Sequence, residues 1–196
     1  MIFGERHSFA VECEFTSQNG TWIYGRFRVW VGGHPIGTYS EEVLTLLCTT
    51  GVLRKSIAVA DSDVASLSPQ EFLDLVWGAV YDGAEYNHDG HRIWSPYVWF
   101  DSCEGFEPVR SVIAKIADTF RIVWQHANEG FAREHYVGVR EYGSVVCDFI
   151  VWLDCGIGDR RVGADRGLTE PSAAPNGGPA TQLGNSGVTE GPPSVS

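Results

Sequence analysis

Hydrophobic and polar residues alternate near the start of the chain in a way that predicts β-strands. From residue 9 to residue 15 the sequence FAVECEF places an apolar side chain at every odd position, which is typical of a strand with one buried face. A second alternating run covers residues 21 to 31, and Asn19-Gly20 between the two runs is a strong hairpin signal. Gly32-Gly33 predicts a turn into residues 34 to 39. We therefore expect a three-stranded antiparallel meander.

Three later stretches show the apolar spacing of helices. Positions 43, 46, 47, 50 and 53 form one stripe, with Ser40 as the candidate N-cap. Ser68, Pro69 and Glu71 form a capping box that begins a second helix, with an apolar face at positions 72, 75, 76 and 79. Positions 109, 112, 113 and 116 predict a third helix after Pro108.

The last part of the apolar sequence is harder to interpret. Residues 119 to 127 fit a strand, which we prefer because they are β-branched and aromatic, although a helix also fits. Residues 135 to 142 predict another strand, and residues 145 to 153 form either a helix or a buried strand. The predicted fold class is α+β: an antiparallel sheet opened by the meander, with about three helices packed on it.

Composition changes sharply after residue 162. Residues 163 to 196 contain no aromatic side chain and are rich in Gly, Pro and Ser. Such a segment cannot bury enough apolar surface to offset the entropy lost on ordering. We therefore predict one domain over residues 1–162 and a disordered tail over residues 163–196, with a docking segment for a partner as the alternative reading of the tail.

Charge and hydropathy exclude several classes of function. The 196 residues carry a formal net charge of −11 without a basic cluster, which disfavours direct binding to nucleic acid or to an acidic membrane surface. The longest fully apolar run has five residues, 149 to 153, which is far too short to cross a bilayer. The N-terminal residues do not resemble a signal peptide, so we expect a cytoplasmic protein. The five cysteines are then expected to be reduced, small core residues.

Motifs for catalysis are mostly absent, so we predict no catalytic residues and no cofactor. The sequence Asn87-His88-Asp89-Gly90-His91 offers two imidazoles and a carboxylate, which are ligand types for zinc. A polar turn is the simpler interpretation of this segment. A small hydrolase or metal-dependent enzyme that uses His88 and His91 remains an alternative function.

The distribution of charge carries more information than any motif. Residues 61 to 107 contain ten acidic residues and one basic residue, Arg92, whereas residues 1 to 60 and 108 to 162 are each neutral. The same segment contains Tyr and Trp residues that look exposed, together with Phe106, although Trp77, Trp94 and Trp99 could each be a core residue instead. Acidic and aromatic side chains together favour an interface for a basic protein. The candidate partner-binding residues are Asp82, Glu85, Tyr86, Asp89, Trp94, Trp99, Asp101, Glu104 and Glu107.

The opening of the chain resembles a known family. The segments MIFG at residues 1–4, FAVECE at 9–14, WIYGRF at 22–27, WVGG at 30–33 and IG at 36–37 are together similar to the start of the Imm42 family. Members of that family are immunity proteins of bacterial polymorphic toxin systems. The resemblance implies a protein that binds and neutralises a cognate toxin by stoichiometric contact, and it implies no catalytic residue.

Besides the enzyme that would use His88 and His91, two hypotheses follow. The first is a cytoplasmic immunity protein whose acidic segment contacts a basic toxin. The second is an adaptor that binds its partner through the tail over residues 163–196.

Overall fold

The computed structural model describes residues 1–20, 22–39, 46–81, 88–101, 103, 105–106 and 108–164. These residues form two antiparallel sheets and four α-helices, which confirms the α+β class. In chain order the four-stranded sheet A is followed by helices α1 to α3, then by the three-stranded sheet B and the long helix α4.

Sheet A contains the predicted meander and one further strand that the sequence pattern did not reveal. Its strands pair in chain order. They are β1 (Ile2–Gly4), β2 (Phe9–Asn19), β3 (Trp22–Val31) and β4 (His34–Ile36). The hairpin at Asn19-Gly20 is confirmed, because Asn19 pairs with Trp22 and Gly20 has a φ of 60°. The additional strand β1 lies at the edge of the sheet, where it pairs with β2.

A β-bulge in β2 brings the charged residues of the hairpin opposite one another. Next to the turn the register joins Ser17 to Tyr24, but beyond the shift between Phe15 and Ser17 it joins Glu12 to Arg28. Without this extra residue the apolar positions of β2 would lie opposite the polar positions of β3, because a shift of one residue moves every side chain to the other face. The bulge therefore separates a buried face from a charged face.

The segment predicted as the third helix is a strand of sheet B. This sheet consists of β5 (Val109–Ile116), β6 (Thr119–His126) and β7 (Arg133–Gly138), paired in chain order. The prediction of a helix over 109–116 was wrong, whereas the preferred strand over 119–127 is confirmed as β6. Val112 and Ile113 point to opposite faces of β5 and are both buried. A strand covered on both faces has apolar residues at odd and even positions, which imitates helical spacing.

The helices agree with the sequence analysis in part. They are α1 (Leu46–Ile57), α2 (Pro69–Val80), α3 (His88–Trp94), the short 3-10 helix η1 (Ser95–Tyr97) and α4 (Val139–Ala164). Ser40 and residue 43 lie outside the described residues, so the N-cap of the first helix stays a prediction. Helix α1 continues through Gly51. The turn expected at Asp89-Gly90 lies instead in the first turn of α3.

The capping box of α2 is confirmed. The Ser68 hydroxyl accepts a hydrogen bond from the Glu71 backbone N–H, and the Glu71 carboxylate accepts one from the Ser68 backbone N–H. The apolar face of this helix is shifted from the expected one, since Leu73 is fully buried and Leu75 is 40% exposed. Helix α2 packs against sheet B, where Phe72 belongs to the core.

The structure shows whether residues 145–153, after sheet B, form a helix or a strand. The strand expected over residues 135–142 ends at Gly138, and α4 begins at Val139, so residues 145–153 are helical. Its buried residues repeat at helical spacing and face sheet A. Residues 163 and 164 lie within α4, and the rest of the expected tail, 165–196, lies outside the described residues.

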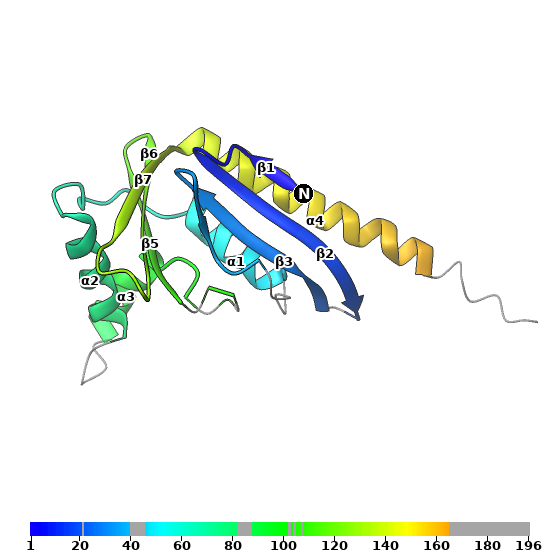
Figure 1. The fold of residues 1–196 in the computed structure, drawn as a ribbon, viewed down its shortest axis with the longest axis horizontal. Helices are drawn as coiled ribbons and strands as arrows, with labels where there is room; N and C mark the ends of the chain where they lie inside the picture. Colours follow the sequence, from blue (N-terminus) through cyan, green and yellow to red (C-terminus); the bar gives the residue numbers. More distant parts are fainter. Residues whose placement is uncertain are drawn as a thin grey trace, which may run out of the picture.

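The elements form layers, as Figure 1 shows, with α2 and α3 at one end beyond sheet B and α4 running along sheet A. Helices α1 and α4 pack on the inner face of sheet A, where the rings of Phe9 and Tyr142 stack with centroids 4.5 Å apart. One face of sheet B contributes to this core, since the ring centroids of Phe120 and Tyr142 are 4.7 Å apart. The other face packs against α2 in a second core. The outer face of sheet A carries no such layer among the described residues.

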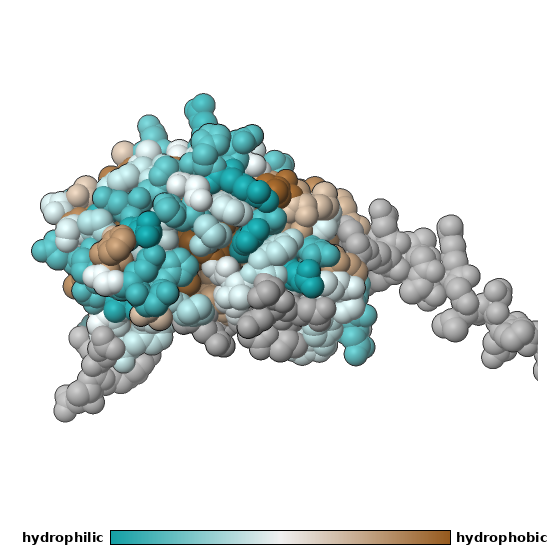
Figure 2. Space-filling view, viewed as in Figure 1, coloured by the Kyte–Doolittle hydropathy of each residue, from teal (hydrophilic) through white to brown (hydrophobic). Residues whose placement is uncertain are grey.

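The expectation that all five cysteines are core residues was wrong for three of them. Cys13 and Cys103 are buried, whereas Cys48, Cys147 and Cys155 are exposed on helices, and none of the five forms a disulfide. No described helix has the length and apolar composition needed to cross a membrane. The surface presented in Figure 2 is largely hydrophilic, with hydrophobic residues scattered over it.

Candidate functional site

The structure places four of the predicted partner-binding residues, of which three reach the surface and one, Trp99, is buried. Asp89 is highly exposed on α3, with Arg92 Nη2 4.0 Å from its Oδ1. Asp101 is exposed in the loop after η1. Trp94 is half-buried at the end of α3, with its ring 5.5 Å from that of Tyr97. The other predicted residues lie outside the described part of the chain. They are Asp82, Glu85, Tyr86, Glu104 and Glu107.

Trp99 and Phe106 correct the expectation of exposed aromatics. Trp99 is fully buried in the main core, next to Phe100. The ring of Phe106 stacks on that of Phe100 at 4.4 Å and lies against Gly37, where a Cβ atom would meet it at 2.8 Å. The loop after η1 therefore delivers its aromatic side chains inward, and Trp99 cannot contact a partner. Sequence pattern alone did not reveal this because the segment is neither a regular helix nor a regular strand.

The exposed side of α2 carries a cluster that combines acids with aromatic rings. Asp74 pairs with Arg110 of β5, and the Arg110 guanidinium lies 5.7 Å from the centroid of the Trp77 ring. One turn later Tyr81 donates a hydrogen bond to Asp101. Burial and the Asp101 carboxylate raise the pKa of the Tyr81 hydroxyl, so this group stays neutral at physiological pH. The cluster connects α2 to the acidic loop after η1.

Hydrogen bonds and an ion pair keep the Asp74 carboxyl group ionised. The hydrogen bond from Gln70 and the pairing with Arg110 lower the pKa of its carboxyl group, against a smaller opposing effect of burial. The carboxylate is therefore ionised well below neutral pH. It contributes negative charge to the exposed side of α2, but much of that charge is offset locally by Arg110.

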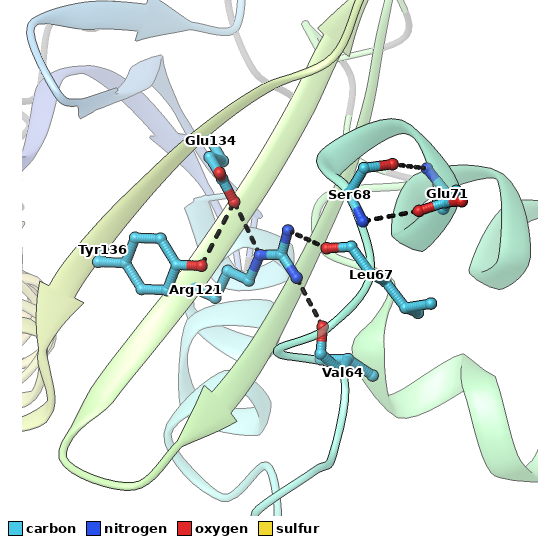
Figure 3. Close-up of polar contacts among 7 residues, drawn as sticks. All are labelled: Val64, Leu67, Ser68, Glu71, Arg121, Glu134 and Tyr136. Carbon is cyan, nitrogen blue, oxygen red and sulfur yellow. Dashed lines mark hydrogen bonds and ion pairs between the residues drawn. The ribbon is translucent and has the colours of Figure 1, made fainter.

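Arg121 holds the loop that leads into α2, as Figure 3 shows. Its side chain is 2% exposed in β6, and its three donor nitrogens all have acceptors. Nε donates to Glu134 of β7 over 2.8 Å, Nη1 to the Val64 carbonyl over 2.7 Å and Nη2 to the Leu67 carbonyl over 2.8 Å. This buried cation positions α2 on sheet B, and with it the acidic surface. In the sequence Arg121 stood within a predicted strand as an ordinary polar residue, with no signal that marked it as buried.

A second polar cluster, also missed, lies on the outer face of sheet A. The Glu12 carboxylate accepts hydrogen bonds from Arg6 Nη2 at 3.0 Å, Arg28 Nε at 2.7 Å and Trp30 Nε1 at 2.8 Å. Burial by itself would raise the pKa of Glu12, but the hydrogen bonds from Arg28 and Trp30 and the charges of the two arginines outweigh it. The pKa of Glu12 is therefore lowered. Opposite charges on the polar faces of the two predicted strands were the available sequence signal.

The histidines of the alternative enzyme hypothesis lie on α3. His91 is half-buried, while the His88 side chain and residue 87 lie outside the described part of the molecule. Among the side chains that the structure describes, no three His, Cys, Asp or Glu residues are grouped as a metal site requires. The geometry therefore offers no positive support for a metal-dependent function.

Comparison with known families supports the immunity-protein hypothesis. The model of the immunity protein 42 family, Imm42, matches residues 1–152, which include both sheets and most of α4. The chain belongs to the Imm42 family. This assignment confirms the resemblance seen in the first forty residues and extends it to residue 152. As an immunity protein, this Imm42 member neutralises a toxin.

A solved structure supports the fold of this Imm42 member. The crystal structure of CdiI from Burkholderia dolosa AUO158 matches with a TM-score of 0.57 and 20% sequence identity, and the match covers 77% of this chain and 99% of that chain. At this level of identity the likeness concerns the fold. No curated protein sequence matches the chain.

Proposed function

We propose that this Imm42 protein neutralises its toxin by forming a stoichiometric complex, without enzymatic modification of the toxin, and that the toxin surface it meets is basic. The observation that carries the proposal is the concentration of ten acidic residues and one basic residue within residues 61 to 107 of a family member. Such a segment attracts a basic surface over long distances and accelerates encounter.

The described acids of this segment support the proposal by their positions. Asp63, Asp89 and Asp101 are all exposed. Asp61 and Asp74 pair with Lys115 and Arg110 from the neighbouring sheet B. The local pairs reduce the negative charge but do not cancel it, because the segment has far more acids than these two bases can offset. We propose Asp82, Glu85, Tyr86, Asp89, Trp94, Asp101, Glu104 and Glu107 as contact residues.

Stoichiometry is tested by titrating the cognate toxin domain, sought first among the neighbouring genes, with the full-length protein. Inhibition that is complete at equimolar protein, and that scales with the amount added, is the expected result. An enzyme would inactivate an excess of toxin with time. Time-dependent inactivation at a small molar fraction would therefore overturn the stoichiometric mechanism.

The contact surface is tested by charge reversal. Changing Asp82, Glu85 and Asp89 together to Lys should slow association about ten-fold at low ionic strength and flatten its salt dependence. The matched control changes Asp118, Glu141 and Asp148 to Lys, which alters net charge equally at exposed positions outside the acidic segment. Equal slowing in the two variants would show that only net charge matters and would overturn the placement.

A further inference from the structure

The outer face of sheet A contains a preorganised cluster that the proposed function leaves unexplained. We call the side chains of Arg6, Glu12, Arg28, Trp30 and Tyr39 the arginine–tryptophan cluster. Glu12 and Arg28 are cross-strand partners on β2 and β3, while α1 and α4 cover the opposite face of the sheet. Within the described residues, no helix or further strand packs over this cluster.

Glu12 is the fixed centre of the cluster. Its side chain is 11% exposed, and its two oxygen atoms receive three donors from three different side chains. The carboxylate is thus turned inward and its charge is used within the cluster. A partner that approaches this face meets the donors around Glu12 and not its acceptor oxygens.

Aromatic rings hold both arginines in place. The Arg28 guanidinium lies 4.7 Å from the Trp30 ring centroid and 4.6 Å from that of Tyr39, and the Arg6 guanidinium lies 4.6 Å from the Trp30 ring. Each distance is within the range of cation–π attraction. The hydrogen bonds and the rings together fix both guanidinium planes before any partner arrives.

Both guanidinium groups have N–H donors that form no hydrogen bond within the cluster. In the part of the chain that the structure describes, the two Nη atoms of Arg28 and the Nη1 atom of Arg6 have no hydrogen-bond acceptor. The two side chains are 25% and 47% exposed. Two cations and one buried carboxylate leave this cluster with a net charge of +1 on a protein whose net charge is −11. The local charge therefore has the opposite sign to that of the whole protein.

Folding stability accounts for only part of this arrangement. The pairs around the buried Glu12 carboxylate stabilise the fold, but two ordered arginine side chains lose rotamer entropy. In an interface the same order is useful, because the entropy is lost before binding, and Trp, Tyr and Arg are the residues that most often dominate binding energy.

We infer that the arginine–tryptophan cluster is a close-contact surface for the toxin and that Arg6 and Arg28 receive a carboxylate from an acidic segment of it. This inference rests on the proposed function and adds a second contact to it. Guanidinium groups with unused N–H donors bind carboxylates in two-point geometry, which explains why planar arginines are held here. The acidic segment would govern the rate of encounter, and this cluster the lifetime of the complex.

The test measures the association and dissociation rates of the cognate toxin domain with the full-length protein. Arg6→Gln and Arg28→Gln keep a polar side chain of similar reach and remove the cation. We expect each variant to dissociate about thirty-fold faster with nearly unchanged association, as for a residue that dominates binding. Arg54→Gln is the matched control, because Arg54 is also exposed and pairs with Asp154 on the helical side of the molecule.

The outcomes separate this inference from the proposed function. Faster dissociation of both cluster variants, with the control unchanged, supports the inference. Dissociation rates equal to that of the control would overturn it while leaving toxin binding intact. Absence of toxin binding by the unchanged protein would overturn the proposed function itself. Arg6→Gln decides the case if Arg28→Gln fails to fold, since the Arg6 side chain is nearly half exposed.

Discussion

Nη1 of Arg121 donates a hydrogen bond to the carbonyl oxygen of Val64 over 2.7 Å, although the two residues are 57 positions apart in the chain. The bond joins a buried residue of β6 to the loop ahead of α2. A buried cation with three acceptors is expensive to disturb, because every acceptor that loses its donor must be solvated again or left unpaired.

Replacement of Arg121 by Met tests this connection. Met fills much of the same volume but donates no hydrogen bond, so the Val64 and Leu67 carbonyls lose their donor. We expect the free energy of unfolding to fall by about 3 kcal/mol, measured by urea denaturation. Arg92→Met is the control, since the Arg92 side chain is 81% exposed, and it should change stability by less than about 0.5 kcal/mol. Equal stability of the two variants would contradict a structural role for Arg121.

Two glycines should respond to alanine in opposite directions. At Gly25 in β3 an added Cβ would collide with the backbone of Glu14 and lie 3.0 Å from Leu46 Cδ1 of α1. Gly25→Ala should therefore destabilise the protein by about 2 kcal/mol. Gly51 is exposed in α1 and an added Cβ meets no atom within 4 Å, so Gly51→Ala should stabilise by about 0.5 to 1 kcal/mol through helix propensity. Thermal unfolding of both variants measures the contrast, and a stabilising Gly25→Ala would show that α1 does not pack there.

Thiol labelling should divide the five cysteines into two classes. Burial raises the pKa of Cys13 and of Cys103 to about 12, so both stay protonated and shielded at pH 8. Cys48, Cys147 and Cys155 are exposed. We expect three thiols to react rapidly with an aromatic disulfide reagent, and five after unfolding in guanidinium chloride. Cys103→Ser should leave the rapid count unchanged, and a rapid count of two would place Cys103 on the surface.

Acid should weaken the folded state partly through Glu12. Its pKa is lowered in the folded protein, so its stabilising contribution is present above the unfolded value of 4.5 and disappears as the pH falls through the folded value. Glu12→Gln should therefore be less stable than the unchanged protein by about 1 to 2 kcal/mol at pH 7. The difference should shrink below pH 4.5. Denaturation curves at several pH values measure it, and a difference that does not vary with pH would exclude Glu12 as the titrating group.

Local signals predicted the parts of the fold that short segments decide. The hairpin at Asn19-Gly20 and the capping box of Ser68 and Glu71 follow from the backbone needs of a turn and of a helix start, which a few residues satisfy by themselves. The error over residues 109–116 has a different origin. Those residues are apolar on both faces because sheet B is buried between α2 and the main core, and periodicity cannot show which elements will cover a strand.

The candidate binding surfaces were also predictable only where local sequence decides them. Exposure of Asp89 followed from its polar surroundings, but the burial of Trp99 depended on how the loop after η1 turns into the core. The arginine–tryptophan cluster required Arg6, from the turn between β1 and β2, to lie against the side chain of Trp30. A charge pattern across two predicted strands pointed toward Glu12 and Arg28, whereas contact with Arg6 depended on the path of the chain.

By itself the sequence determined the α+β class, the N-terminal hairpin, the start of α2, the concentration of negative charge within residues 61 to 107 and the resemblance to immunity proteins. Each of these is a property of a segment, set by local backbone preference, composition or residue identity. Only the tertiary structure decided that β5 is a strand, that Trp99 is inaccessible, and that a bulge after Phe15 places Glu12 opposite Arg28. These outcomes depend on which distant segments exclude water from one another, and that is a property of the whole packed chain.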